Sequence, residues 1–301
     1  MGNKVLYTSD MHGDEKQFRA LVEYALQTKP NVVIIGGELL PRGFGKITPG
    51  YPYMQRKFAQ ERLPALLRPI KQNLPDTPIY VIPGNDDCSV NDDVLNEENG
   101  IFTNIDGKRV PLPGGLEIVG CSLVPFTPFV IKDREVFDGN ENYKRANSSD
   151  YLKGAISVRH GNKLEWSPVE ITEANRGQSL RKVLTGPTFS GNYAKTVYLF
   201  HTPPVNALDF IYDRKNVGSV SVREFIEKNQ PALTLHGHIH ETVDMTGEYN
   251  TQIGSTICMA AGNEPDESKL AVLTFDLDNL ADVKRIKLPS TFFGKLISRI
   301  F

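Results

Sequence analysis

Short apolar runs that stop abruptly at polar, glycine-containing segments are the feature that most constrains how this chain can fold. Val5 to Thr8 is followed by SDMHGD, Val32 to Ile35 by GGELL, and Ile79 to Ile82 by PGNDD. Helical periodicity follows the first run, from Phe18 to Ala25, and the long segment from about Tyr51 to Asn73 also has helical character. This alternation predicts an α/β fold in which polar side chains gather at the carboxyl ends of strands, where such sheets bind ligands.

The second half of the chain has more predicted strands than the first. Apolar runs indicate strands at Leu116 to Gly120, Thr196 to Phe200, Ala232 to Leu235 and Leu270 to Phe275, with a short helix at Val222 to Asn229. A second α/β half is therefore expected.

A polar, irregular segment from about Lys132 to Ala194 separates these halves. We interpret this segment as an insertion that could form a lid. It is expected to contain a hairpin at Ala155 to Trp166 that turns at Gly161-Asn162. Residues 1–289 are then expected to form a single domain with an insertion at about 132–194.

Residues 290–301 have the pattern of a C-terminal amphipathic tail, in which Ser290-Thr291 would cap a short helix with one apolar face. About ten residues are few for an isolated helix. We therefore expect the tail to pack on its own domain or to join two copies in a homo-oligomer, with attachment to a membrane surface as the alternative.

The charge balance excludes a strong overall attraction to nucleic acid or anionic membranes. Lys and Arg total 34 against 36 for Asp and Glu, a formal net charge of −2. The three cysteines, Cys88, Cys121 and Cys258, do not suggest a disulfide framework. The amino-terminal segment lacks the apolar stretch of a signal peptide, and no run approaches the roughly 18 to 20 apolar residues of a membrane span. These features predict a cytoplasmic protein.

Four of the six histidines lie in short polar clusters just after predicted strands, beside carboxylate and amide side chains. The candidate metal ligands are Asp10, His12, Glu38, Asn85, His201, His238 and His240. Nitrogen and carboxylate ligands without thiolate suit Mn, Fe or Zn better than Ca, which prefers oxygen. Seven candidates exceed what one tetrahedral ion needs, which indicates two divalent ions that share a bridging carboxylate.

The spacing of two ligand pairs has a mechanical interpretation. In an extended segment, residues i and i+2 point the same way, so Asp10 with His12, and His238 with His240, could each reach one site. Gly237 is expected to let the backbone approach this site closely.

The order of these motifs resembles that of the calcineurin-like metallophosphoesterases, with DMH, GELL, GNDD, an isolated His201 and GHIH in succession. The resemblance extends from Asp10 to His240, and the stretch from Asn216 to Glu241 is similar to a bacterial and archaeal branch of that family. It implies a four-layer αββα sandwich of two mixed sheets flanked by helices.

The resemblance also implies the role of each ligand. Asp10, His12 and His240 would hold the first metal, Asn85, His201 and His238 the second, and Glu38 would bridge them. The implied activity is hydrolysis of small phosphate-ester substrates by a hydroxide that bridges two ions, most often Mn, with Fe or Zn as alternatives.

Two departures from the family pattern affect the expected chemistry. Glu38 stands where the family usually has the bridging aspartate, and its extra methylene should shift the bridge. Asp86 stands where the family often has the histidine that contacts the scissile phosphate and protonates the leaving group. Asn85 and Asp86 are thus the predicted catalytic residues, and phosphodiesters or activated esters are the expected substrates because their leaving groups depart unassisted.

Several alternatives stay open from the sequence alone. Glu38 could face solvent, and Asp86 and Asp87 could cap a short helix at Val90 to Leu95. The chain could then be a catalytically weakened scaffold that binds a protein partner, and the same ligand types also occur in redox di-iron proteins. His236 is interpreted as a strand residue rather than a ligand.

Overall fold

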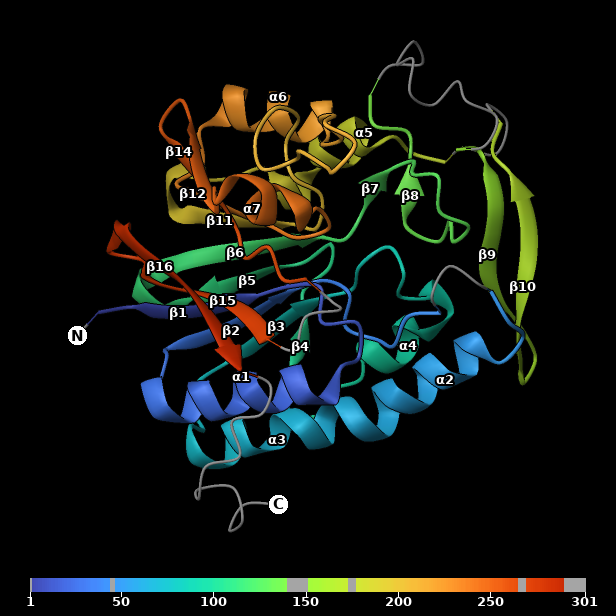
Figure 1. Cartoon of the computed structure of the whole chain (residues 1–301), viewed down its shortest axis with the longest axis horizontal. Helices are drawn as coiled ribbons and strands as arrows, with labels where there is room; N and C mark the ends of the chain where they lie inside the picture. The colour runs from blue at the N-terminus through green and yellow to red at the C-terminus, as the bar shows by residue number, and fades with distance from the viewer. Residues whose placement is uncertain (1, 44–46, 140–150, 173–176, 265–268, 290–301) are drawn as a thin grey trace.

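The computed structural model describes residues 2–43, 47–139, 151–172, 177–264 and 269–289, so the predicted tail at 290–301 and any contact it makes between two copies lie outside the described residues. Two six-stranded sheets lie face to face, with helices on the outer face of each (Figure 1).

The amino-terminal sheet has the strand order β16-β15-β1-β2-β3-β4. Strands β1 to β4 run parallel, while β15 and β16 are antiparallel to their neighbours, so the sheet is mixed. Its strands are β1 (Lys4–Thr8), β2 (Val32–Gly36), β3 (Ile79–Ile82), β4 (Thr103–Asn104), β15 (Lys269–Asp276) and β16 (Asn279–Pro289).

The second sheet has the order β13-β14-β12-β11-β6-β5, with four parallel strands inside and an antiparallel strand at each edge. Its strands are β5 (Arg109–Leu112), β6 (Leu116–Cys121), β11 (Thr196–Phe200), β12 (Leu233–His236), β13 (Asn250–Ile253) and β14 (Thr256–Ala260). The strand runs expected from the sequence are confirmed in both sheets, whereas β4, β5, β13, β14 and β16 were not predicted.

The helices start and stop at recognisable caps. Asp14 accepts hydrogen bonds from the backbone of the first turn of α1, and Ser219 does the same for α6. The long predicted helix at 51–73 is confirmed as two α-helices joined by one π-helical turn, η1. The helical segments are α1 (Glu15–Thr28), α2 (Tyr51–Lys57), η1 (Phe58–Arg62), α3 (Leu63–Asn73), η2 (Ser89–Asn91), α4 (Asp92–Leu95), η3 (Pro113–Gly115), α5 (Leu180–Leu184), η4 (Pro187–Phe189), η5 (Tyr193–Lys195), α6 (Val220–Asn229) and α7 (Glu241–Thr246).

Three apolar cores hold the layers together. One packs α1 and α3 on the first sheet, a second fills the space between the two sheets, and a third packs α5 and α6 on the second sheet. The Tyr7 hydroxyl crosses the middle core from β1 and donates to the carbonyl of His236 on β12, at 2.6 Å. The predicted four-layer αββα sandwich is therefore confirmed, and His236 is a buried strand residue as expected.

The predicted hairpin is confirmed as β9 (Lys153–His160) and β10 (Lys163–Glu170), which pair across Gly161-Asn162. The short strands β7 (Val124–Pro125) and β8 (Glu135–Val136) lie beside it in Figure 1. The predicted division into one domain with an insertion stays a prediction, as does the cytoplasmic location. No helix in the described part of the chain has the length and apolar character needed to cross a membrane.

Candidate metal centre

The predicted ligands follow parallel strands of both sheets, at the edge where these strands end. Asp10 follows β1, Glu38 follows β2, Asn85 follows β3, His201 follows β11 and His238 follows β12. Because the two sheets are stacked, ligands far apart in the sequence face one another across the interface between the sheets. His240 lies at the start of α7.

Four of these residues have a left-handed backbone. The φ angles of Asp10, His12, Glu38 and His238 are 57°, 46°, 52° and 66°, which makes them four of the nine non-glycine residues with positive φ in the described chain. This conformation costs on the order of 1 kcal/mol or more per residue and concentrates at functional sites. The expectation that Asp10 and His12, or His238 and His240, lie in extended segments is therefore wrong, because these turns aim the side chains instead.

Glu38 lies at the centre of the cluster. Its Oε1 is 3.3 Å from His201 Nε2 and its Oε2 is 3.7 Å from His12 Nδ1. Asn85 Oδ1 lies 3.3 Å from the same His201 nitrogen, and the backbone N–H of Asp86 donates to Glu38 Oε1 at 3.0 Å. Glu38 is only 2% exposed, so the alternative in which it faces solvent is wrong.

The remaining ligands surround this centre. His238 N donates to Asp10 Oδ1 at 3.0 Å, and the rings of His238 and His201 are 5.2 Å apart. One cavity of about 750 Å³ is lined by six of the seven predicted ligands and by Asp86. The seventh, His201, is fully buried and reaches the cluster through its contacts with Glu38 and Asn85.

The donor set fits a divalent cation. Among the described residues, His12 Nδ1 and Glu38 Oε2 are buried polar atoms without a hydrogen-bond partner. Single ligand atoms of His12, Glu38 and Asp86 lie within 4.8 Å of one another. Buried polar atoms are rarely left unsatisfied unless another group completes their coordination. Asp86, predicted to be catalytic, is thereby also a candidate ligand.

The electrostatics lead to the same conclusion. Burial, followed by the charge of Asp86, raises the pKa of Glu38 to about 8, and burial with the charge of Asp87 raises the pKa of Asp86 to about 6. Burial and the neighbouring Arg42 lower the pKa of His12 to about 3, which leaves its imidazole neutral. Burial alone would lower the pKa of His201, but the hydrogen bond with Glu38 raises it to about 9. A neutral imidazole is the form that binds a metal ion, as at His12, whereas at Glu38 and His201 a bound cation would displace the proton that the raised pKa values favour.

Two glycines make room for these contacts. A Cβ on Gly37, whose φ is 112°, would lie 2.2 Å from His201 Nδ1. A Cβ on Gly237 would lie 3.0 Å from Asp10 Oδ2, which confirms the close approach predicted for this position.

The sequence matches the family model for calcineurin-like phosphoesterases over residues 3–242. The chain belongs to the calcineurin-like phosphoesterase family. Metal-dependent hydrolysis of phosphoesters is therefore its class of activity, and small phosphate esters are the substrates typical of the family. Among curated proteins, none matches the chain.

Solved structures share the fold at low sequence identity. One crystal structure aligns over 96% of this chain and 100% of its own, with a TM-score of 0.62 and 15% identity. The protein TT1561 of Thermus thermophilus aligns over 95% of this chain and 99% of its own, with a TM-score of 0.52 and 16% identity.

A second carboxylate of the GNDD motif fixes two metal-centre loops of this phosphoesterase. Asp87 is fully buried and accepts hydrogen bonds from the backbone N–H groups of Leu39, Leu40 and Gly84, at 2.9, 2.9 and 2.8 Å. It thereby joins the loop after Glu38 to the loop that carries Asn85. The alternative in which Asp86 and Asp87 only cap a helix is wrong, since Asp87 binds the backbone of two loops and neither η2 nor α4 is capped by the side chain of the residue before it.

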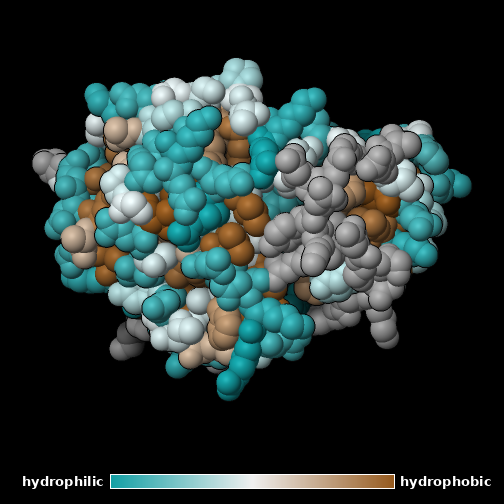
Figure 2. Space-filling view, turned by 90° about the horizontal axis from the view of Figure 1, so that it is seen from above, coloured by the Kyte–Doolittle hydropathy of each residue, from teal (hydrophilic) through white to brown (hydrophobic). Residues whose placement is uncertain are grey.

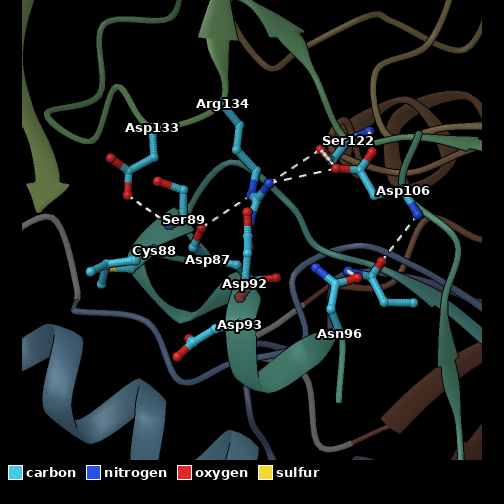
Figure 3. Close-up of polar contacts among 12 residues, drawn as sticks. Asp87, Cys88, Ser89, Asp92, Asp93, Asn96, Asp106, Ser122, Asp133 and Arg134 are labelled. Atoms are coloured by element: carbon cyan, nitrogen blue, oxygen red, sulfur yellow. Dashed lines mark hydrogen bonds and ion pairs between the residues drawn. The ribbon is translucent and has the colours of Figure 1, made fainter. Parts of the chain in front are cut away.

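Arg134 supports the Asp87 loop from the other side. Its Nε donates to the carbonyl of Asp87 at 3.2 Å, and its guanidinium forms ion pairs with Asp92 and, at 3.7 Å, with Asp106 (Figure 3). Asp133, the preceding residue, accepts from the backbone of Ser89 at 2.9 Å. The GNDD loop is therefore held by residues about 45 positions further along the chain.

Three residues of the site were not found from the sequence. Asn263 donates to the carbonyl of Asp10 at 3.1 Å, and Glu264 Oε1 lies 2.8 Å from His240 Nδ1. Both follow β14, where the run TICMA ending in AGNE carries the same strand-then-polar signal as the other motifs. Arg42, four residues after Glu38, lines the cavity, and no local pattern distinguishes it.

Proposed function

We propose that this chain hydrolyses phosphodiesters or activated phosphate esters with two divalent ions held by the predicted ligands. The observation that carries the proposal is the division of the Glu38 carboxylate, because Oε2 faces His12 while Oε1 faces His201, whose Nε2 also lies beside Asn85 Oδ1. A carboxylate can bridge two ions with one oxygen toward each, and the two oxygens of Glu38 are placed for this. Ligand atoms about 2.1 Å from a shared ion lie roughly 3.0 to 3.4 Å apart, close to these distances.

In this arrangement Asp10, His12 and His240 would hold one ion, Asn85, His201 and His238 would hold the other, and Glu38 would contribute to both. The mixture of nitrogen and oxygen ligands suits Mn first, then Fe or Zn. When bound, such ions lower the pKa of a coordinated water and neutralise the charge of a phosphoryl group.

The remaining polar groups of the cavity bind and orient the substrate. Asn85 and Asp86 lie side by side, with Asn85 Nδ2 donating to Asp86 Oδ1 at 3.3 Å, so the amide is held in one orientation. Arg42 lines the cavity, and its charge acts on both His12 and Asp86. A guanidinium in this place can pair with phosphoryl oxygens.

Asp86 decides which esters react fastest. It replaces the histidine that the family uses as an acid, and an aspartate beside bound cations is held in its ionised form. It cannot then protonate a departing alkoxide, so esters with good leaving groups are favoured.

The test combines metal analysis with hydrolysis of model esters. The purified chain should contain about two divalent ions per molecule after Mn loading, and should hydrolyse bis(4-nitrophenyl) phosphate with Mn but not with EDTA. His201→Ala should lose both metal and activity. His160→Ala, at an exposed hairpin histidine with a side chain 73% accessible, should lose neither. Absence of metal binding and hydrolysis in the wild type would instead favour a scaffold that binds a protein partner.

A further inference from the structure

The cavity that contains the metal cluster continues onto an apolar wall. Most of this wall comes from the segment after β7, and we call its six main residues the apolar wall: Phe126, Pro128, Phe129, Val130, Ile131 and Phe137. The cavity volume of about 750 Å³ is in the range that encloses a drug-sized molecule rather than a phosphate ion alone.

Tyr51 joins the wall to the metal cluster. Its hydroxyl donates to the carbonyl of Asp86 at 3.2 Å and accepts from Gln55 Nε2 at 3.1 Å. Its ring stacks on Trp166, with 5.9 Å between the ring centroids. Tyr51 therefore lines the cavity directly beside Asp86, a predicted catalytic residue.

The wall is rigid although part of it is exposed. Lys132 and Glu135 form a fully buried ion pair at 2.7 Å, and Lys132 Nζ also donates to the carbonyl of Thr127 at 2.7 Å. Phe126 packs edge-to-face on Phe137 at 4.9 Å. These contacts fix both ends of the 126–137 segment before any ligand binds.

Phe129 and Val130, at the free part of the wall, are 54% and 39% exposed. Figure 2 shows hydrophobic surface on this side of the molecule, toward the β9–β10 hairpin at the right. Large apolar side chains held in water by a rigid loop, next to a catalytic centre, indicate a surface that is covered when the substrate binds.

The charges in the cavity argue against a second phosphate group on the substrate. Asp138, Asp213 and Glu241 line it, against Arg42 and Lys215 as cations. A nucleotide with additional phosphates would meet these carboxylates, whereas an uncharged apolar group would not.

We propose that the substrates of this phosphoesterase carry a large apolar group, a long alkyl chain or an aromatic system, which lies on the apolar wall while the phosphate binds at the metal cluster. This inference rests on the proposed function, and it adds the class of organic group that the site selects.

The test varies the apolar group while the leaving group stays constant. Methyl, butyl and octyl 4-nitrophenyl phosphate all release 4-nitrophenolate, so the same bond is broken in each. Each fully buried methylene increases the binding constant about fourfold. Because the apolar wall is partly exposed, the gain per methylene should be smaller, and we expect kcat/KM to rise on the order of tenfold from the methyl to the octyl ester. The esters are compared with Mn and below the concentration at which they form micelles.

Two matched variants assign the effect to the wall. Phe129→Ala removes an exposed ring and should reduce the preference for octyl over methyl several-fold. Met54→Ala removes an exposed apolar side chain, 43% accessible, that does not line the cavity, and should leave the preference unchanged. Calorimetry of octylphosphonate and methylphosphonate binding to the Mn-loaded chain should show a more negative heat-capacity change for octylphosphonate.

The outcomes separate the two proposals. Mn-dependent hydrolysis at equal rates across the series would overturn the apolar subsite and leave the proposed function standing. Absence of hydrolysis for every ester would overturn both. A full octyl preference retained in Phe129→Ala would show that the apolar group lies elsewhere.

Discussion

Replacement of Asp87 offers a stringent test of how the metal centre is built. In Asp87→Ala, three buried backbone N–H groups, those of Leu39, Leu40 and Gly84, lose their acceptor. Each unsatisfied buried donor costs about 1 to 3 kcal/mol, and such losses do not add fully. We expect the free energy of unfolding to fall by about 4 kcal/mol, in the range for breaking a buried charged network.

Asp87→Asn should cost less, for a geometric reason. Oδ2 accepts from both Leu39 and Gly84, while Oδ1 accepts from Leu40 alone. The amide can keep its oxygen at the doubly bonded position and place its nitrogen toward Leu40, which loses one bond and costs about 2 kcal/mol. The free energy of unfolding is therefore expected to be highest for the wild type, lower for Asp87→Asn and lowest for Asp87→Ala.

The assay is urea denaturation in EDTA and again with saturating Mn. Metal bound to the folded state adds RT ln(1 + [Mn]/Kd) to the free energy of unfolding. If the loops are displaced in the variants, Mn should bind more weakly and should increase their free energy of unfolding by less than it does in the wild type. Asp282→Ala is the control, because its carboxylate is 67% accessible and makes one 3.7 Å contact with Lys284. The view that Asp87 fixes these loops would be refuted if Asp87→Ala lowered the free energy of unfolding by less than about 1 kcal/mol and Mn stabilised this variant as much as the wild type.

Three further predictions test single groups. Glu38→Ala should lose one of two ions by elemental analysis while Glu38→Asp keeps both and preserves or raises activity; unchanged metal content in Glu38→Ala would mean that Glu38 does not bridge. If Asp86 takes the place of the family's acid, as proposed, aryl esters should react far faster than alkyl esters, and Asp86→His should raise the rate for alkyl esters relative to aryl esters. Equal rates across leaving groups, with chemistry limiting, would contradict this role. Hydrogen bonding to Arg56 lowers the pKa of Asp93 to about 2, so its ionised form stabilises the fold above about pH 4 and loses that effect as the pH falls toward 2. Asp93→Asn should thus lower the free energy of unfolding by at most about 1 kcal/mol at pH 7, because the side chain is 47% exposed. The difference in unfolding free energy between wild type and variant should disappear on acidification. A difference independent of pH would exclude this role of Asp93.

The positions of five candidate metal ligands could be predicted from the sequence because each one lies within three residues of the end of a strand. A buried parallel strand requires a continuous apolar run, and the first polar residues after it must leave the sheet at its carboxyl edge. Asp10, Glu38 and Asn85 follow this rule in the first sheet, and His201 and His238 follow it in the second. Periodicity over a few residues therefore sufficed to place all five at strand ends.

The relation between these ends depends on the tertiary structure. Glu38 and His201 lie 163 positions apart, and they come within 3.3 Å only because two sheets stack over one apolar core. No local pattern states which oxygen of Glu38 faces which ligand, or that the backbone at Asp10 and His12 is left-handed rather than extended.

The supporting residues depend even more on long-range contacts. Asp87 and Asn263 act through backbone groups brought to them by other loops, so the strand-then-polar pattern before each of them does not tell which backbone groups they bind. The apolar wall was not predicted either, because no motif in the segment from Phe126 to Ile131 indicates that it lines the cavity. Local sequence determined which residues of this phosphoesterase lie at strand ends, because strand formation depends on near neighbours. The packing of the two sheets and their loops decided which side chains and backbone groups those residues contact, because those contacts join segments remote along the chain.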